Sequence, residues 1–500
     1  MILRLLIGFA VCAASLVADV RLPALFSDHM LLQGGVPVHV WGKADPGEEV
    51  SIRFQAQNIS TTTDARGRWE AFLSPLDPGG ASELHVQGKN AVTIRDVLVG
   101  DVWIASGQSN MVWSVQRSDH AEKEIAAATY PQIRLFKVAL KVSPTPLDDV
   151  TGTWVVCSPE TVGDFSGVGY FFARHLNRQL KKPIGVIQSA WGGTPAESWT
   201  SGPALAADPA LISVFADWAK LMSDYPVAYA RYQQQVQALE AKGAAAGVRK
   251  PNPPIGQNHQ WSPAGLYNAM IAPLTPYAIK GAIWYQGENN ASKRRSYVYR
   301  RLFQAMIQDW RTAWGQGDFP FLFVQLANYA RTGANSEWPE LREAQAMALN
   351  LKNTGMAVTI DVGNADDIHP TNKQDVGLRL ALAARAIAYG EKLVYSGPMF
   401  RQATREGSSL RVWFDHTGGG LTAKGGQLKG FTVAGADGKF VSAAAVIQKS
   451  AVRVSSPQVS EPVAVRYAWA DSPDCNLYNA EGLPASPFRS DEWPEPRLYR

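Results

Sequence analysis

The residues with the clearest chemical potential form a short polar stretch that follows an apolar run. The apolar residues 102–105 are followed, after one serine, by Gly107, Gln108, Ser109 and Asn110. A glycine permits a sharp turn from strand to helix, and the first backbone N–H groups of that helix point at a side chain placed there. Such a serine can attack an ester while the N–H groups stabilise the oxyanion. The alternative is that the serine only caps the helix, which this stretch alone favours.

A second polar stretch supplies a histidine with carboxylates close by. In NADDIHPTNKQD, His369 lies three residues after Asp366 and two after Asp367. A carboxylate at that separation can fix the imidazole tautomer and stabilise the imidazolium form. The alternative is that either aspartate caps the helix expected to begin near Asn372. Of the eight histidines, His369 alone combines the end of a predicted strand with adjacent carboxylates.

Two further polar stretches offer groups that could stabilise an oxyanion. The stretch SAWGGTPAESW contains Gly192 and Gly193, whose bare backbone can donate N–H groups. The stretch WYQGENN contains Gln286 and Asn290, whose side-chain amides can also donate. Ordinary connecting loops are the alternative for both stretches.

All four stretches follow short apolar runs that are typical of buried strands. These runs are VLVGDVWIAS, KPIGVIQSAW, IKGAIWYQGE and GMAVTIDVG, and a fifth run is FPFLFVQLA. Near-continuous apolar runs suit parallel strands covered on both faces, and patterns with helical periodicity separate them. The alternation predicts an α/β fold with a doubly wound parallel sheet over residues 93–392. Ligands of such sheets bind at the carboxyl ends of the strands, so we expect the four stretches to converge there.

Regions of different character flank and interrupt this sheet. Residues 19–92 alternate apolar and polar positions between turns, which predicts an N-terminal β-sandwich domain. Residues 393–500 return to that pattern and predict a C-terminal β-rich domain. Residues 201–262 are rich in Ala, Gln and Pro and begin with helical patterns, which indicates a helical insertion or lid.

The N-terminus has the pattern of an export signal. Residues 1–18 contain one arginine, an apolar run over residues 5–14 and then small residues, as in a signal peptide. A membrane anchor is the less favoured alternative, because the run is shorter than the ~20 residues that span a bilayer. We therefore expect an exported protein, periplasmic or secreted, with no membrane partner once the signal is removed. Its other cysteines, Cys157 and Cys475, could form a disulfide or remain thiols.

Composition and missing motifs narrow the functional class. The net charge of +4 over 500 residues gives no argument for a nucleic acid or an anionic membrane as partner. The sequence has no G-x-S-x-G elbow, no P-loop and no G-x-G-x-x-G after a strand. It also lacks H-E-x-x-H and paired Cys-x-x-Cys motifs, so neither a metal nor another cofactor is expected.

Several blocks of the sequence resemble one known family. GQSNM, QGENN and DIHPTNK are similar to the signature blocks of the sialate O-acetylesterase-like family, within the wider SGNH/GDSL hydrolases. LFSDHMLLQ, AWGGTPAESW and GLPASPFRSD also resemble that family, in the expected order, from about residue 23 to 490. The resemblance implies a flavodoxin-like SGNH hydrolase domain with accessory β-sandwich domains. It also implies hydrolysis of acetyl esters on sugars.

Matched block by block, the resemblance assigns a nucleophile and a base. Ser109 of GQSNM becomes the nucleophile and His369 of DIHP the general base. The general SGNH pattern places the acid three residues before the histidine, at Asp366. The DIHP motif of this family instead indicates Asp367. We prefer Asp366 slightly on spacing, and a Ser–His dyad with a weaker third partner stays open.

The same resemblance implies an oxyanion hole. The backbone N–H groups of Ser109 and of Gly193 or Gly192 would line it. The usual third donor is an Asn in a Gly-x-Asn-Asp block, and this chain has QGENN instead. Gln286 is therefore the first candidate for the third donor and Asn290 the second.

The expected reaction removes an O-acetyl group from an oligosaccharide through an acetyl-enzyme, and the sugar is either sialic acid or a hemicellulose such as xylan or xyloglucan. Trp191, Tyr285 and Glu288 lie in the predicted loops and are the candidate substrate contacts. Sialic acid needs a cation for its carboxylate, for which Arg331 and Lys373 are the candidates. The alternatives are a non-catalytic glycan-binding protein and an esterase for other short acyl chains.

Overall fold

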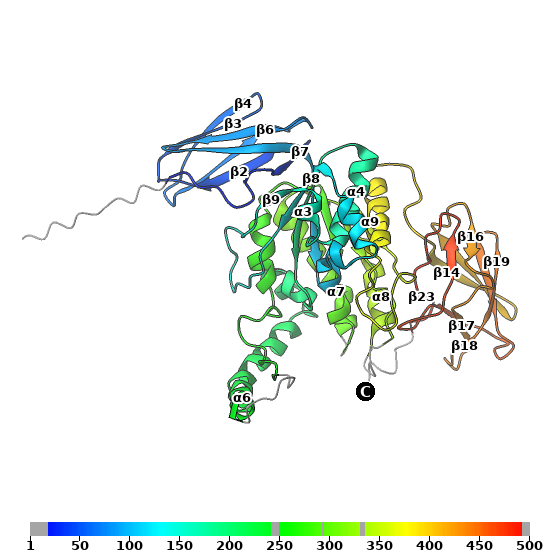
Figure 1. Cartoon of the computed structure of the whole chain (residues 1–500). Coiled ribbons are helices and arrows are strands. Elements are labelled where there is room, and N and C mark those ends of the chain that lie inside the picture. Colours follow the sequence, from blue (N-terminus) through cyan, green and yellow to red (C-terminus); the bar gives the residue numbers. More distant parts are fainter. Residues whose placement is uncertain (1–18, 242–249, 293–294, 331–335, 493–500) are drawn as a thin grey trace, which may run out of the picture.

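In the computed structural model, a central α/β domain lies between two β-domains (Figure 1). The predicted signal peptide, residues 1–18, and Arg331 lie outside the described residues, so export stays a prediction. Among the helices that are described, none is both long and apolar enough to cross a membrane. The structure describes residues 19–241, 250–292, 295–330 and 336–492.

A mostly parallel sheet forms the middle of the molecule. Its strand order is β13-β12-β11-β7-β10-β8-β9, and all neighbours run parallel except the edge pair β8–β9. The inner strands β10, β11 and β12 are buried at every residue, as expected for a sheet covered on both faces. In sheet order the strands span Thr354–Ala357, Phe321–Val324, Gly281–Tyr285, Ala91–Gly107, Ile184–Ala190, Tyr130–Lys137 and Trp154–Cys157.

Helices cover both faces of this sheet. Trp103 of β7 packs edge-on against Phe172 of α4, which in turn packs along α9. Trp284 of β11 lies three residues beyond Gly281, the register partner of Trp103, so Trp284 points to the opposite face. There it packs against Trp310 of α7, with ring centroids 5.8 Å apart. The main helices span Gly167–Leu180 (α4), Arg295–Trp314 (α7), Trp338–Met347 (α8) and Lys373–Ile387 (α9), and the short ones Ser109–Val112 (α1), Ala121–Ala126 (α2) and Pro159–Val162 (α3).

β7 joins the N-terminal β-domain to the central sheet as a single strand of 17 residues. Its first half pairs antiparallel with β6 (Ser82–Gln87), and its second half pairs parallel with β10 and β11. The predicted boundary between residues 92 and 93 therefore falls inside a strand, and one hydrophobic core runs through both domains. The remaining strands of the domain are Leu31–Gln33 (β1), Val38–Lys43 (β2), Glu49–Phe54 (β3), Gln57–Thr62 (β4) and Arg68–Leu73 (β5).

The C-terminal domain has a hydrophobic core of its own, between two four-stranded antiparallel sheets. The buried guanidinium of Arg342, on α8, donates to the carbonyl oxygens of Ala470 and Asp471 at 2.7 and 2.9 Å. These bonds fix the domain against the helix layer of the central domain. Its strands are Met399–Glu406 (β14), Ser409–Asp415 (β15), Leu421–Ala423 (β16), Phe431–Ala434 (β17), Val441–Ser442 (β18), Ala444–Gln448 (β19), Ala451–Ser455 (β20), Ala464–Tyr467 (β21), Leu477–Asn479 (β22) and Phe488–Arg489 (β23).

The segment 201–262, predicted as a helical insertion, contains α5 (Gly202–Ala207) and α6 (Ser213–Ala241). α6 extends away from the central sheet (Figure 1). None of its residues is fully buried. The return segment packs on it, since Gly256 lies against the ring of Tyr225.

The two cysteines among the described residues are free thiols. Cys157 ends β9 in the core of the central domain, and Cys475 belongs to the C-terminal domain. Burial raises the pKa of Cys157 to about 12 and that of Cys475 to about 11. The disulfide that the sequence left open is therefore not formed in this structure.

Candidate active site

A tight turn at the end of β7 presents Ser109 to solvent. Gly107 ends the strand with φ of +136°, and a Cβ atom there would lie 2.1 Å from the carbonyl oxygen of Tyr285. Only glycine fits this position, and α1 begins two residues later at Ser109. Ser106, on the strand side of the turn, is fully buried, whereas Ser109 is partly exposed. The turn thus separates a structural serine from an accessible one.

The structure brings His369 onto Ser109 across 260 positions of sequence. Nε2 of His369 lies 2.8 Å from Oγ of Ser109. When the imidazole carries its proton on Nδ1, the serine hydroxyl donates to Nε2, which is the arrangement that a general base requires. The nucleophile and base predicted from sequence therefore stand within hydrogen-bond distance.

The carboxylate beside this histidine belongs to Asp367. Its Oδ1 lies 3.5 Å from Nδ1 of His369 and accepts the backbone N–H of the same residue at 2.9 Å. The backbone N–H of Asp366 donates instead to Asn364. This contact therefore favours Asp367, against the slight preference for Asp366 that the spacing gave. Asp367 is 55% exposed, so its contact resembles the weak third partner of a dyad more than a buried triad member.

A stacked indole holds the imidazole in place. Trp113 lies parallel to His369, with ring centroids 5.2 Å apart, and the guanidinium of Arg117 covers the indole at 3.7 Å. Burial lowers the pKa of His369, and the charges of Lys373 and Arg117 lower it further, while Asp367 acts in the opposite direction. The imidazole therefore stays neutral, and able to accept a proton, to lower pH than an ordinary histidine.

The Gly192–Gly193 loop lies against the nucleophile. A Cβ atom on Gly192 would stand 3.4 Å from Cβ of Ser109. The carbonyl of Trp191 accepts from the Thr194 hydroxyl at 2.8 Å, and that of Gly192 accepts from Gln260 at 3.0 Å. In a trans peptide the N–H points away from the carbonyl, so these bonds turn the N–H groups of both glycines away from those partners.

Backbone donors therefore remain available in the turn of Ser109 and in the Gly192–Gly193 loop beside it. Within the described part of the chain, no hydrogen bond uses the N–H groups of Ser109, Gly192 or Gly193. Backbone donors beside a nucleophile stabilise the oxyanion of a tetrahedral intermediate. The backbone half of the predicted oxyanion hole is thus compatible with the geometry.

The side-chain half of that prediction is not supported. Gln286 is fully buried, donates to Thr194 and to Asn290, and accepts from the hydroxyl of Tyr299. Asn290 is 1% exposed, and its amide group donates to Glu197 at 2.9 Å. Both side chains are committed to protein partners and secure the Gly192–Gly193 loop from below. They position the backbone donors instead of acting as donors themselves.

A buried polar network lies directly behind the nucleophile, and sequence reasoning missed it. Asn110 is 1% exposed, and its Nδ2 donates to Oε1 of Glu288 at 2.6 Å and to the carbonyl of Ile368 at 3.0 Å. Its Oδ1 accepts from Nζ of Lys373 at 2.6 Å. The network connects the residue after Ser109 with the residue before His369. The available signal was the position of Asn110 and Lys373 inside two of the family-like blocks.

Burial shifts the titration of both charged members. Burial lowers the pKa of Lys373 to about 7, although the carboxylate of Glu288 acts in the opposite direction. Burial raises the pKa of Glu288, and its Oε2 is a buried atom without a hydrogen-bond partner among the described residues. No group of three or more His, Cys, Asp and Glu side chains in the described ranges is placed to hold a metal ion.

The sequence of the chain matches a known family over its central domain. The family described as "Carbohydrate esterase, sialic acid-specific acetylesterase" matches residues 99–241 and 255–388, more than half of the chain. The chain belongs to this family of carbohydrate esterases. Its matched region holds the complete serine–histidine site and the network behind it.

Similar proteins extend the match beyond the central domain. Mouse sialate O-acetylesterase is 31% identical over 94% of both chains, and the rat protein is 34% identical over 76% of both. The crystal structure of a carbohydrate acetylesterase from Xanthomonas citri covers 95% of this chain and 100% of its own, with 40% identity and a TM-score of 0.83. The protein is a carbohydrate O-acetylesterase. The alternative of a non-catalytic glycan-binding protein is therefore excluded.

The remaining predicted contacts of this carbohydrate esterase divide between surface and core. Trp191 is half-buried beside the turn, where its backbone N–H donates to the carbonyl of Gly107. Tyr285 is fully buried beneath the site, with Nζ of Lys373 5.4 Å from its ring, so the structure does not place it against a substrate. Lys373 is fully buried as well and cannot bind the carboxylate of a sialic acid, as the sequence had suggested. Glu288 faces Asn110 in the network, not an open substrate surface.

Proposed function

We propose that this esterase removes O-acetyl groups from saccharides through an acetyl-enzyme formed on Ser109, within a flavodoxin-like SGNH hydrolase domain. The observation that supports this mechanism is the 2.8 Å contact between Oγ of Ser109 and Nε2 of His369. Nucleophile and base in hydrogen-bond contact are the arrangement that covalent acyl transfer needs. The serine at the end of a central parallel strand, with helices on both faces of the sheet, supports the SGNH assignment.

The proposed reaction has two steps with one base. His369 takes the proton of Ser109 while Oγ attacks the acetyl carbonyl carbon, and the backbone N–H groups of Gly192 and Gly193 receive the oxyanion. The imidazolium then returns the proton to the leaving sugar oxygen, which gives the free sugar and acetyl-Ser109. Water repeats the attack with His369 as base and releases acetate.

The acetylated sugar is a sialic acid or a unit of a hemicellulose such as xylan or xyloglucan. The names of the mouse and rat relatives support the first, while that of the Xanthomonas enzyme supports carbohydrate acetyl esters in general. Acetyl release from O-acetylated sialosides, xylan and xyloglucan oligosaccharides, compared at equal ester concentration, distinguishes them. Butyryl and longer esters in the same assay test the alternative of another short-chain esterase.

The acetyl-enzyme itself can be trapped. Rapid quenching with p-nitrophenyl acetate should yield protein that carries one acetyl group, located on Ser109 by peptide mass spectrometry. Ser109→Ala should carry none. An acetyl group on another residue, or full turnover without any acetylated protein, would contradict the proposed mechanism.

A further inference from the structure

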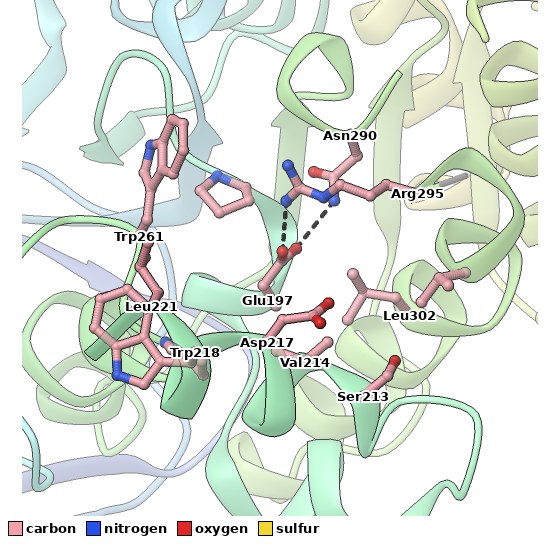
Figure 2. A pocket seen from close by; sticks show the side chains of 13 residues that line it. Glu197, Ser213, Val214, Asp217, Trp218, Leu221, Trp261, Asn290, Arg295 and Leu302 are labelled. Carbon is pink, nitrogen blue, oxygen red and sulfur yellow. Dashed lines mark hydrogen bonds and ion pairs between the residues drawn. The ribbon is translucent and has the colours of Figure 1, made fainter. Parts of the chain in front are cut away.

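A cavity of about 240 Å³ lies beside the catalytic loop, between the η2 turn (Ala196–Trp199), α6 and α7. Figure 2 shows two indoles on one side, a guanidinium on the other and two carboxylates between them. α6 contributes residues 213, 214, 217, 218 and 221, and this i, i+1, i+4 pattern forms one face of the helix. The side chains relevant to binding are Glu197, Asp217, Trp218, Trp261, Asn290 and Arg295.

This cavity shares its wall with the oxyanion loop. Nε1 of Trp261 and Nδ2 of Asn289 each donate to the carbonyl oxygen of Gly193 at 2.7 Å. The neighbouring Gly192 contacts Ser109 on its other side. The two-glycine loop therefore contacts Ser109 through Gly192 and Trp261 of the cavity lining through Gly193.

The lining has the composition of a sugar site. Trp218 and Trp261 are only partly buried, and their rings offer flat apolar surfaces. Carboxylates nearby can accept hydrogen bonds from sugar hydroxyls. Apolar walls with a few polar groups are the usual composition of a ligand site.

Charge selects the kind of sugar. Arg295 is paired with Glu197 and also donates to Asn289, so its charge is already compensated. Asp217 is exposed, and no ion pair or hydrogen bond joins its carboxylate to another described residue. The lining therefore carries one surplus negative charge, which disfavours an anionic occupant and suits a neutral one.

We propose that this cavity binds a neutral sugar unit linked to the acetylated unit, so that the enzyme acts preferentially on oligosaccharides. The inference rests on the proposed acetyl transfer at Ser109, which places the reacting unit on the other side of the loop. It concerns the unit beside the reacting one and therefore applies to a hemicellulose chain and to a sialic acid on a neutral glycan.

Chain length tests the proposal. KM for acetate release should fall about fivefold from acetylated xylose to acetylated xylotriose, because the second unit gains an aromatic contact. The same comparison with O-acetylated sialic acid, free and linked to lactose, covers a sialoside substrate. Trp218→Ala should remove the length dependence by raising KM for the longer substrates, with kcat for the single-unit substrate as the reference. Ser223→Ala, at an exposed position on the side of the same helix away from the cavity, is the control and should keep the length dependence.

A charge reversal tests the neutral occupant. Asp217→Lys should weaken binding of xylotriose acetate or leave it unchanged. The competing outcome uses an oligosaccharide with a uronic acid next to the acetylated unit. If the parent enzyme binds it more tightly than the neutral oligosaccharide, and Asp217→Lys tightens that binding further, the assignment of a neutral unit is overturned.

The two proposals fail in different ways. p-Nitrophenyl acetate has no sugar, so its turnover reports acetyl transfer alone. Turnover of this ester together with equal KM values for short and long sugars would overturn the cavity assignment and leave the acetyl transfer standing. Absence of an acetyl-enzyme with every ester would instead overturn the proposed acetyl-enzyme mechanism.

Discussion

Two adjacent groups of polar residues differ in how the protein surrounds them. Ser109 and His369 stand partly exposed, and the carboxylate beside the imidazole is 55% exposed at 3.5 Å. Behind them, Asn110 and Lys373 are almost completely buried and joined at 2.6 Å. The front pair can meet an ester and water, whereas the rear network meets only protein.

This difference separates reaction from positioning. A buried ammonium or carboxylate is costly unless it is hydrogen-bonded, so the rear network is strongly constrained to one arrangement. Because Asn110 follows Ser109 and also binds the carbonyl of Ile368, that arrangement sets the distance between nucleophile and base. The front pair can therefore be exposed without being loosely placed.

Removal of the nucleophile should have the largest effect. Ser109→Ala is expected to lower kcat for p-nitrophenyl acetate by about 10⁴-fold or more, since no other group can form the acetyl-enzyme. The thermal midpoint should stay near that of the parent, because Ser109 is partly exposed. Ser106→Ala is the matched control: its buried Oγ has no hydrogen-bond partner in the described structure, so activity should persist. Near-normal turnover by Ser109→Ala would refute the assignment.

Disruption of the rear network should come next. Lys373→Met leaves Oδ1 of Asn110 and the carboxylate of Glu288 buried without the ammonium, so the thermal midpoint should fall. In the folded fraction, kcat should fall about thirtyfold through misplacement of Ser109. The positive charge that lowers the pKa of His369 is also lost, so the acid limb of kcat/KM should move to higher pH. A stability loss without either kinetic change would reduce the network to a purely structural role.

Replacement of Asp367 should reduce activity less than replacement of a buried triad carboxylate would. Asp367→Asn removes the group that raises the pKa of His369, so the acid limb should move to lower pH and kcat should fall about tenfold. Asp366→Asn, measured in parallel, should change both the acid limb and kcat by less than Asp367→Asn does. A larger loss from Asp366→Asn would restore the assignment made from spacing.

The sequence predicted which loops meet but not how their side chains pair. Apolar runs and the rule for ligand position place Ser109 and His369 at one edge of the sheet. Spacing along the chain measures separation and not direction, so it could not choose between Asp366 and Asp367. Gln286 and Asn290 looked like donors because both are amides, yet their partners, Thr194 and Glu197 among them, come from a distant loop. The continuity of β7 was equally hidden, because the change from an alternating to a continuous apolar pattern near residue 93 looked like a domain boundary although it lies within one strand.

The smallest effect should come from the cation outside the indole. Arg117 covers Trp113, which in turn stacks on His369, so Arg117→Gln should leave kcat within about twofold of the parent. Loss of its charge should still raise the pKa of His369, so the acid limb of kcat/KM should move to higher pH. The shift has the same sign as that of Lys373→Met and the opposite sign to that of Asp367→Asn.

Titration of kcat/KM at low and high salt checks the origin of the Arg117 shift, because the interaction of an exposed charge weakens with salt while that of buried Lys373 persists. A salt-independent shift at Arg117 would mean that the indole had moved, and with it the imidazole that it holds against Ser109.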